Sequence, residues 1–142
     1  MAHIKTILTV RLILEKDKKL LFLKQTTSNG GGHSLVGGKI DHNESGDEAL
    51  IREAFEEVGI KIKKKHLQLI HLYRRDSNKE IIMVYRARKW IGTPEPLETH
   101  KFKRTRWFST LSLPNDISPT TDHILNMYLK KRFYSEDKIK IL

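Results

Sequence analysis

GKIDHNESGDEALIREAFEEVGI, residues 38–60, is the stretch that decides the fold and chemistry of this 142-residue chain. Ser45 and Glu48 within it have the spacing of a capping box, which favours the start of a helix just after Ser45. Gly59 readily takes the left-handed conformation that ends many helices. The stretch therefore predicts a helix from about residue 46 to residue 58, and this helix carries most of its charged residues.

The predicted helix has an apolar face and a charged face. At about 100° per residue, one arc holds the apolar residues expected to face the core, which are Leu50, Ile51, Ala54, Phe55 and Val58. The opposite arc holds Arg52, Glu53, Glu56 and Glu57. The three carboxylates repel one another at this spacing unless a cation neutralises them. Hard oxygen ligands suit Mg²⁺ or Mn²⁺ better than zinc, so the face predicts such a metal site, with a merely solvated face as the alternative.

The spacing of the whole stretch resembles the signature of the Nudix hydrolase family. Five residues separate Gly38 from Glu44 and seven separate Glu44 from Arg52, and the glutamates, Gly59 and an apolar residue follow in order. Ala54 is smaller than the pattern prefers. The resemblance covers nearly the whole chain and implies an α/β/α sandwich with a mixed sheet. It also implies magnesium-dependent hydrolysis of a diphosphate linked to another group, with Mn²⁺ as a possible substitute.

The resemblance further implies roles for single residues. The catalytic set would be Arg52 and Glu44 together with Glu53, Glu56 and Glu57, and the metal ligands would come from Gly38, Glu53, Glu56, Glu57 and Glu98. Glu53 would be either a third ligand or the general base, and the choice of base stays open. We expect Arg52 to orient a carboxylate through a bidentate contact, while Glu44 either holds a water or secures Arg52. Glu95 is the alternative to Glu98.

The substrate is harder to predict than the reaction. Gly37 would let backbone approach a phosphate closely, Lys39 could contact that phosphate, and Trp107 could stack on a base unless it belongs to the core. The chain resembles the mutator-type branch, which cleaves nucleoside triphosphates to monophosphate and pyrophosphate. Two alternatives stay open: hydrolysis at the triphosphorylated 5′ end of RNA, and a non-catalytic module that binds nucleotide or nucleic acid.

Composition sets limits on the class of protein. The chain has no cysteine and a formal net charge of +10, so disulfides and thiolate chemistry are excluded and polyanions are attracted. We expect a single domain over residues 1–142. We also expect a cytoplasmic protein without membrane contact, since no signal peptide or long apolar run is evident. The partner would be a small nucleotide, RNA binding is the less favoured option, and the oligomeric state is left open.

The remaining elements follow from hydrophobic runs and turn residues. The pattern predicts a hairpin of strands at 4–14 and 19–24, strands at 67–73 and 81–88, and a short strand at Trp107-Phe108. Pro119 opens a second helix that should end near Phe133, and we expect the charged tail after Tyr134 to be mobile. Strands on both sides of a helix in this order predict an α/β fold with a mixed sheet.

Overall fold

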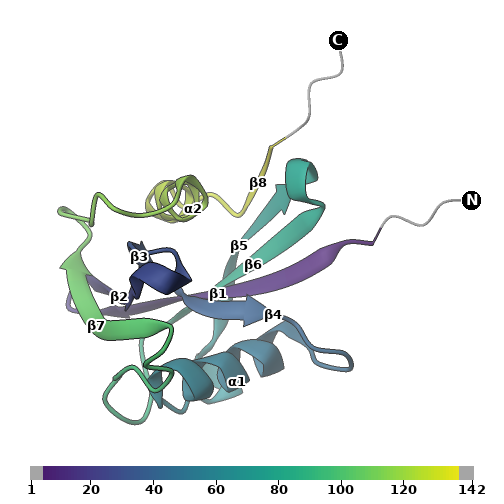
Figure 1. Cartoon of the computed structure of the whole chain (residues 1–142). Coiled ribbons are helices and arrows are strands. Elements are labelled where there is room, and N and C mark those ends of the chain that lie inside the picture. Colours follow the sequence, from purple (N-terminus) through teal and green to yellow (C-terminus); the bar gives the residue numbers. More distant parts are fainter. Residues whose placement is uncertain (1–4, 138–142) are drawn as a thin grey trace, which may run out of the picture.

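A computed structural model describes residues 5–137 of the chain. The strands are β1 (Ile7–Lys16), β2 (Lys19–Gln25), β3 (His33–Ser34), β4 (Val36–Lys39), β5 (Gln68–Arg75), β6 (Glu80–Ala87), β7 (Phe102–Ser109) and β8 (Tyr134–Asp137). The α-helices are α1 (Gly46–Val58) and α2 (Pro119–Leu129) (Figure 1). Short 3₁₀ turns lie at Thr27–Asn29, Lys64–His66 and Asp76–Asn78. Neither α-helix of this range is long and apolar enough to cross a bilayer.

Strand β1 is the centre of a mixed sheet. It pairs antiparallel with β4 on one side and parallel with β6 on the other, where Ile7 lies opposite Glu80 and Leu14 opposite Ala87. The end of β1 turns into β2 through Asp17 and Lys18, both with positive φ, as the predicted hairpin requires. Strand β2 in turn pairs with β3 and β7. On the far side β5 runs antiparallel to β6, and β8 runs parallel to β5.

The two helices cover opposite faces of this sheet (Figure 1). Because side chains alternate along a strand, Val10, Leu12 and Leu14 of β1 pack with α1, whereas Ile13 packs with the α2 residues Ile124 and Leu125. Strand β2 alternates in the same way: Leu21 and Leu23 pack on the α1 side of the sheet, and Leu20 and Phe22 pack on the α2 side. The predicted α/β/α sandwich with a mixed sheet is therefore confirmed.

Several predicted boundaries were wrong. The short strand at Trp107-Phe108 is the full strand β7, and the charged tail forms β8 through Asp137 instead of being mobile there. Helix α2 ends at Leu129, not near Phe133, because Lys131 takes a left-handed conformation with φ 56°. A lysine is an uncommon residue for that conformation, so the sequence gives no stop signal. Residue 4, the predicted start of the first strand, and residues 138–142 lie outside the described range.

Candidate active site

Helix α1 begins and ends where the sequence predicts. The Ser45 side chain accepts a hydrogen bond from the Glu48 N–H, and the Glu48 carboxylate accepts one from the Ser45 N–H, which closes the capping box. Gly59 has φ 72° and donates its N–H to the Phe55 carbonyl. Both ends are thus fixed by local hydrogen bonds, and the helix presents its charged residues in a defined orientation.

The orientation differs from the predicted one. Glu57 is buried with 6% of its surface exposed, whereas Phe55 is 50% exposed. The buried residues of α1 are Ala49, Leu50, Ala54, Glu57 and Val58. At about 100° per residue, the centre of this buried arc is shifted by about 70° from the centre of the predicted apolar arc. The helix is therefore rotated about its axis so that part of its carboxylate face lies against β4. Small residues on that strand make the rotation possible.

Those small residues are Gly37 and Gly38 of β4. A Cβ on Gly38 would lie 2.6 Å from a carboxylate oxygen of Glu53, so any larger residue would displace that side chain. A Cβ on Gly37 would overlap the Val10 carbonyl oxygen of the paired strand, and Gly37 has φ 152°. The pair of glycines therefore lets strand, helix and carboxylate approach one another closely.

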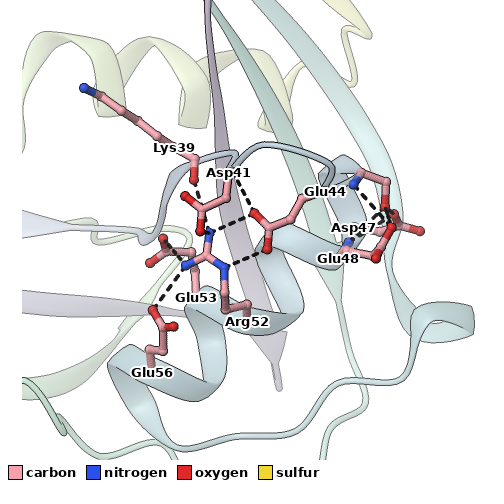
Figure 2. Close-up of polar contacts among 9 residues, drawn as sticks. Lys39, Asp41, Glu44, Asp47, Glu48, Arg52, Glu53 and Glu56 are labelled. Carbon is pink, nitrogen blue, oxygen red and sulfur yellow. Dashed lines mark hydrogen bonds and ion pairs between the residues drawn. The ribbon is translucent and has the colours of Figure 1, made fainter.

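Arg52 is the centre of a network of carboxylates (Figure 2). Its guanidinium donates to both oxygens of Glu44, at 2.7 and 3.0 Å, and to Glu53 at 3.1 Å and Glu56 at 3.2 Å. It also donates to the Lys39 carbonyl at 3.3 Å. The hydrogen bonds to Glu44, followed by the charge of Glu53, raise the pKa of Arg52, and the contact with Arg52 lowers the pKa of Glu44. Because Asp41 also lies 3.4 Å from the guanidinium, Arg52 is a permanently charged anchor that holds four acidic side chains.

Glu57 has a different environment. Its Oε1 accepts a hydrogen bond from the Gly37 N–H at 3.0 Å. Burial, assisted by the negative charge of Glu53, raises the pKa of Glu57 to about 8, although the Gly37 N–H and the more distant charge of Arg11 act in the opposite direction. Glu53 and Glu57 are therefore two carboxylates in contact, and no arginine pairs directly with Glu57 in the described part of the chain. Such a pair favours either a proton or a cation between its members.

The other predicted residues lie around this centre. Lys39 is exposed, and its side chain points away from the carboxylates (Figure 2). The loop that carries Glu98 is tied to the end of α1, because the Leu97 N–H donates to the Glu57 carbonyl at 2.9 Å. The Glu98 carboxylate itself pairs with Lys101 at 3.6 Å. Trp107 is half-buried and stacks on Trp90, with ring centroids 5.9 Å apart, so one of its faces is taken.

Among residues 5–137, no three acidic or histidine side chains already converge as a set of metal ligands. Two of the predicted ligands, Glu53 and Glu56, are held by Arg52 instead. The donor set still fits a hard divalent cation, since it consists of oxygen atoms and includes a like-charged pair. A cation would therefore compete with Arg52 for carboxylate oxygens.

Sequence reasoning missed a polar cavity of about 250 Å³ on the α2 face. Its lining includes Arg11 and Ser34, the ion-paired Arg75 and Glu80 at 2.9 Å, and Thr120 and Thr121 of α2. Arg11 connects this cavity to the carboxylates, because it pairs in the sheet with Gly37 and its charge acts on Glu57. The signal in the sequence was Arg11, a charged residue within a largely apolar strand. Burying a charge without a partner is costly, so a charge at such a position indicates a polar site.

Comparisons with known proteins agree with this geometry. The family model for the NUDIX domain matches residues 5–128. Similar solved structures include a MutT NUDIX hydrolase from Burkholderia pseudomallei, with 24% identity and a TM-score of 0.76 over 86% of this chain and 97% of that one. The E. coli ORF135 protein has 24% identity and a TM-score of 0.72 over 89% and 90%. A NUDIX hydrolase from Nitrosomonas europaea has 20% identity and a TM-score of 0.74 over 95% and 82%. At these identities the likeness shows the fold, and no curated protein matches the chain.

Proposed function

Because this chain belongs to the Nudix family and is a pyrophosphohydrolase of nucleoside diphosphate derivatives, we propose that it cleaves a nucleoside triphosphate to the monophosphate and pyrophosphate. Nudix hydrolases use divalent metals, and we infer Mg²⁺ as the physiological ion, with Mn²⁺ as a substitute. The proposal places catalysis at the carboxylate face of α1 and the nucleoside in the polar cavity beside Arg11.

The observation that carries the proposal is that Glu53 and Glu57 both lie against β4, where the Gly37 N–H donates to Glu57 at 3.0 Å and a Cβ on Gly38 would lie 2.6 Å from the Glu53 carboxylate. Two carboxylates at a buried position destabilise the fold unless something positive or a proton separates them. The Gly37 N–H needs only a hydrogen-bond acceptor at position 57, which a neutral amide oxygen would also supply, so the packing of α1 does not require a charged residue there. The cost in stability is explained when the pair binds a cation during the reaction.

The residues that would hold the cation are Glu53, Glu56 and Glu57, with the Gly38 carbonyl and Glu98 as further ligands. When bound, the metal supplies neutralisation of the phosphoryl oxygens and acidification of a water. Glu53 serves either as the third ligand or as the base that takes the proton of the attacking water. Arg52 keeps Glu53 and Glu56 oriented through its bonds at 3.1 and 3.2 Å, and Glu44 in turn fixes Arg52.

The cavity beside Arg11 supports the nucleotide part of the proposal. Its size of about 250 Å³ and its hydroxyl, amide and guanidinium lining suit a polar heterocycle better than an apolar ligand. Arg11 lines the cavity, its charge acts on Glu57, and it would contact the phosphate chain. Gly37 offers close approach of backbone, and Lys39 can extend to a terminal phosphate. The stacking role predicted for Trp107 stays a prediction.

A release assay tests the proposal. Purified protein is incubated with nucleoside triphosphates, nucleotide sugars, dinucleoside polyphosphates and RNA with a 5′ triphosphate, each with Mg²⁺ or Mn²⁺, and the products are separated. We expect pyrophosphate and monophosphate from a triphosphate. Release of pyrophosphate only from RNA would mean that the substrate is the 5′ end of RNA, while the proposed reaction would stand. Binding without release of pyrophosphate from any compound would support a non-catalytic module.

The position of bond cleavage gives a second test. Because Glu53, Glu56 and Glu57 would hold divalent cations that neutralise the phosphate chain, we expect water to attack the phosphorus next to the nucleoside. Hydrolysis in ¹⁸O-water should then place the label in the monophosphate. Label found only in pyrophosphate would mean attack at the β-phosphorus and would contradict the arrangement of substrate proposed above.

A further inference from the structure

The end of the sheet where β6 finishes and β5 begins carries two basic cavities, one on each face. The cavity on the α1 face measures about 100 Å³ and is lined by Lys61, Lys63, Lys89, His66 and Trp90. The cavity on the α2 face measures about 240 Å³ and is lined by Arg86, Lys131, Arg132, Tyr128 and Phe133. Each therefore combines three cationic side chains with aromatic surface.

The two cavities are joined along the paired strand ends. Gln68 lies opposite Arg86 in the β5–β6 pair, and the Arg86 guanidinium donates to the Gln68 amide oxygen at 2.7 Å. His66 lies two residues before Gln68, and Lys89 lies three residues after Arg86. At about 3.3 Å per extended residue, three residues span about 10 Å. A few nucleotides of an extended strand can bridge that distance.

The positive charge of this surface is largely unpaired. Within residues 5–137 no ion pair involves Lys61, Lys63, Lys89, Lys131 or Arg132. Glu15, whose pKa is also lowered by the charge of Arg86, is already bound by Arg88 at 2.8 Å and by the Tyr128 hydroxyl. Partial burial, and then the charges of Lys65, Lys89 and Lys63, lower the pKa of His66. These cations thus face one another without the acidic partners that surround Arg52.

Aromatic and apolar side chains accompany the charge. Phe133 is 55% exposed and Ile91 beside Trp90 is 58% exposed, so apolar surface is accessible in both cavities. A lone anion needs no such surface, whereas a polynucleotide offers bases that stack on aromatic rings while lysine and arginine follow its phosphates. An anionic membrane also attracts cations, but the cationic and aromatic side chains here line two separate cavities on opposite faces of the sheet, and a flat bilayer surface cannot enter both at once.

We propose that this surface, formed by Lys61, Lys63, Lys89, Arg86, Lys131 and Arg132 around Trp90 and Phe133, binds single-stranded nucleic acid independently of the carboxylate site. This surface would contact several successive phosphates, and one base would stack on an aromatic ring in each of the two cavities. Neither cavity is lined by Glu53 or Glu57, whose carboxylates lie against Gly38 and Gly37 of β4.

Fluorescence anisotropy tests the proposal with a 12-nucleotide oligouridylate that carries a 3′ dye and a 5′ hydroxyl, so that no terminal phosphate enters the hydrolase site. EDTA excludes hydrolysis. We expect binding whose affinity falls with salt at a log–log slope of about −3, as about four phosphate contacts to a single strand require. Oligodeoxyuridylate and anionic phospholipid vesicles serve as the other two ligands.

Matched charge reversals identify the surface. Lys63→Glu with Lys89→Glu, and separately Lys131→Glu with Arg132→Glu, should each weaken oligonucleotide binding at least about tenfold and flatten the salt slope. The control is Lys5→Glu with Lys79→Glu, which makes the same change in net charge at the opposite end of β1 and β6, where both lysines are exposed. This control should lose much less affinity.

Equal losses of affinity in the control and the two test variants would mean general charge attraction and would overturn the proposal. Tighter binding to vesicles than to both oligonucleotides would also overturn it. So would the absence of oligonucleotide binding at about 0.05 M salt. Melting temperature and nucleotide hydrolysis, measured on every variant, verify folding. Because the hydrolase site is not engaged by the probe, failure here leaves the proposed hydrolytic function intact.

Discussion

Glu57 and His71 are both buried polar residues, on opposite faces of the sheet, and their surroundings differ in a telling way. His71 is fully buried, and its Nδ1–H donates to the Arg132 carbonyl at 2.8 Å. A neutral ring must then accept at Nε2, where the Ser135 hydroxyl donates at 2.7 Å. Every polar atom of that ring is thus paired, whereas Glu57 lies against Glu53 of like charge. The comparison separates a polar group whose partners stabilise the fold from one whose burial the proposed cation site would explain.

Replacing Glu57 tests this separation most strongly. Glu57→Gln keeps the size of the side chain but removes its charge, so we expect turnover to fall by about 10²–10⁴-fold. The melting temperature should stay the same or rise, because the like-charge contact with Glu53 is relieved. Steady-state kinetics at saturating Mg²⁺ and a thermal melt measure the two effects. Glu48→Gln is the control, since glutamine also completes a capping box, and full activity of Glu57→Gln would contradict the assignment.

The glycines of β4 allow a second test on the same face. Gly38→Ala introduces a Cβ 2.6 Å from the Glu53 carboxylate without a strained φ, so we expect activity to fall about 10–100-fold while the fold persists. Gly37→Ala instead overlaps the backbone of Val10 and should lower the melting temperature markedly. Equal stability losses in the two variants, or full activity of Gly38→Ala, would count against the role given to Glu53.

On the other face the expected pattern is reversed. Ser135→Ala removes the hydroxyl shared by His71 and His123, which lie 2.7 and 2.8 Å from it, and should destabilise the protein by about 1–3 kcal/mol. The hydrolysis rate per folded molecule should not change. Denaturant titration and kinetics check both statements. A loss of turnover with unchanged stability would mean that this cluster takes part in catalysis.

A smaller effect is expected from pH on the metal-free protein. Burial raises the pKa of Glu57 from its ordinary value of 4.5 to about 8, so the folded state holds a proton that the unfolded state releases. By linkage, this group contributes stability below about pH 4.5 that is lost as pH rises through about 8. The melting temperature of Glu57→Gln should therefore exceed that of the wild type increasingly between pH 5 and pH 8 in EDTA. A constant difference would contradict the raised pKa.

The sequence was sufficient to predict the helix at residues 46–58 and both of its ends, because capping residues act locally. It was not sufficient for the rotation of that helix, which depends on the two glycines of β4 and the packing of α1 against the sheet. For the same reason Phe55 was wrongly placed in the core and the burial of Glu57 was not foreseen.

Long-range pairing explains the remaining differences. The strand β8 forms because β5 offers a free edge, and Lys131 redirects the chain toward it through an uncommon conformation. The cavity beside Arg11 brings together residues from β1, β3, β5, β6 and α2, and no local pattern in the sequence relates these segments to one another. Local hydrogen-bond chemistry was thus predictable, and contacts between distant segments were not.

Calorimetric titration of the metal-free protein with Mn²⁺ at pH 7, in buffers of different ionisation enthalpy, tests the central claim that Glu53 and Glu57 hold a divalent cation. A ligand with a raised pKa must lose its proton on binding, so the wild type should bind Mn²⁺ with release of about one proton. Glu48→Gln should behave like the wild type, and Glu57→Gln should bind weakly without releasing a proton. Equal affinity and equal proton release in Glu57→Gln and the wild type would contradict the claim.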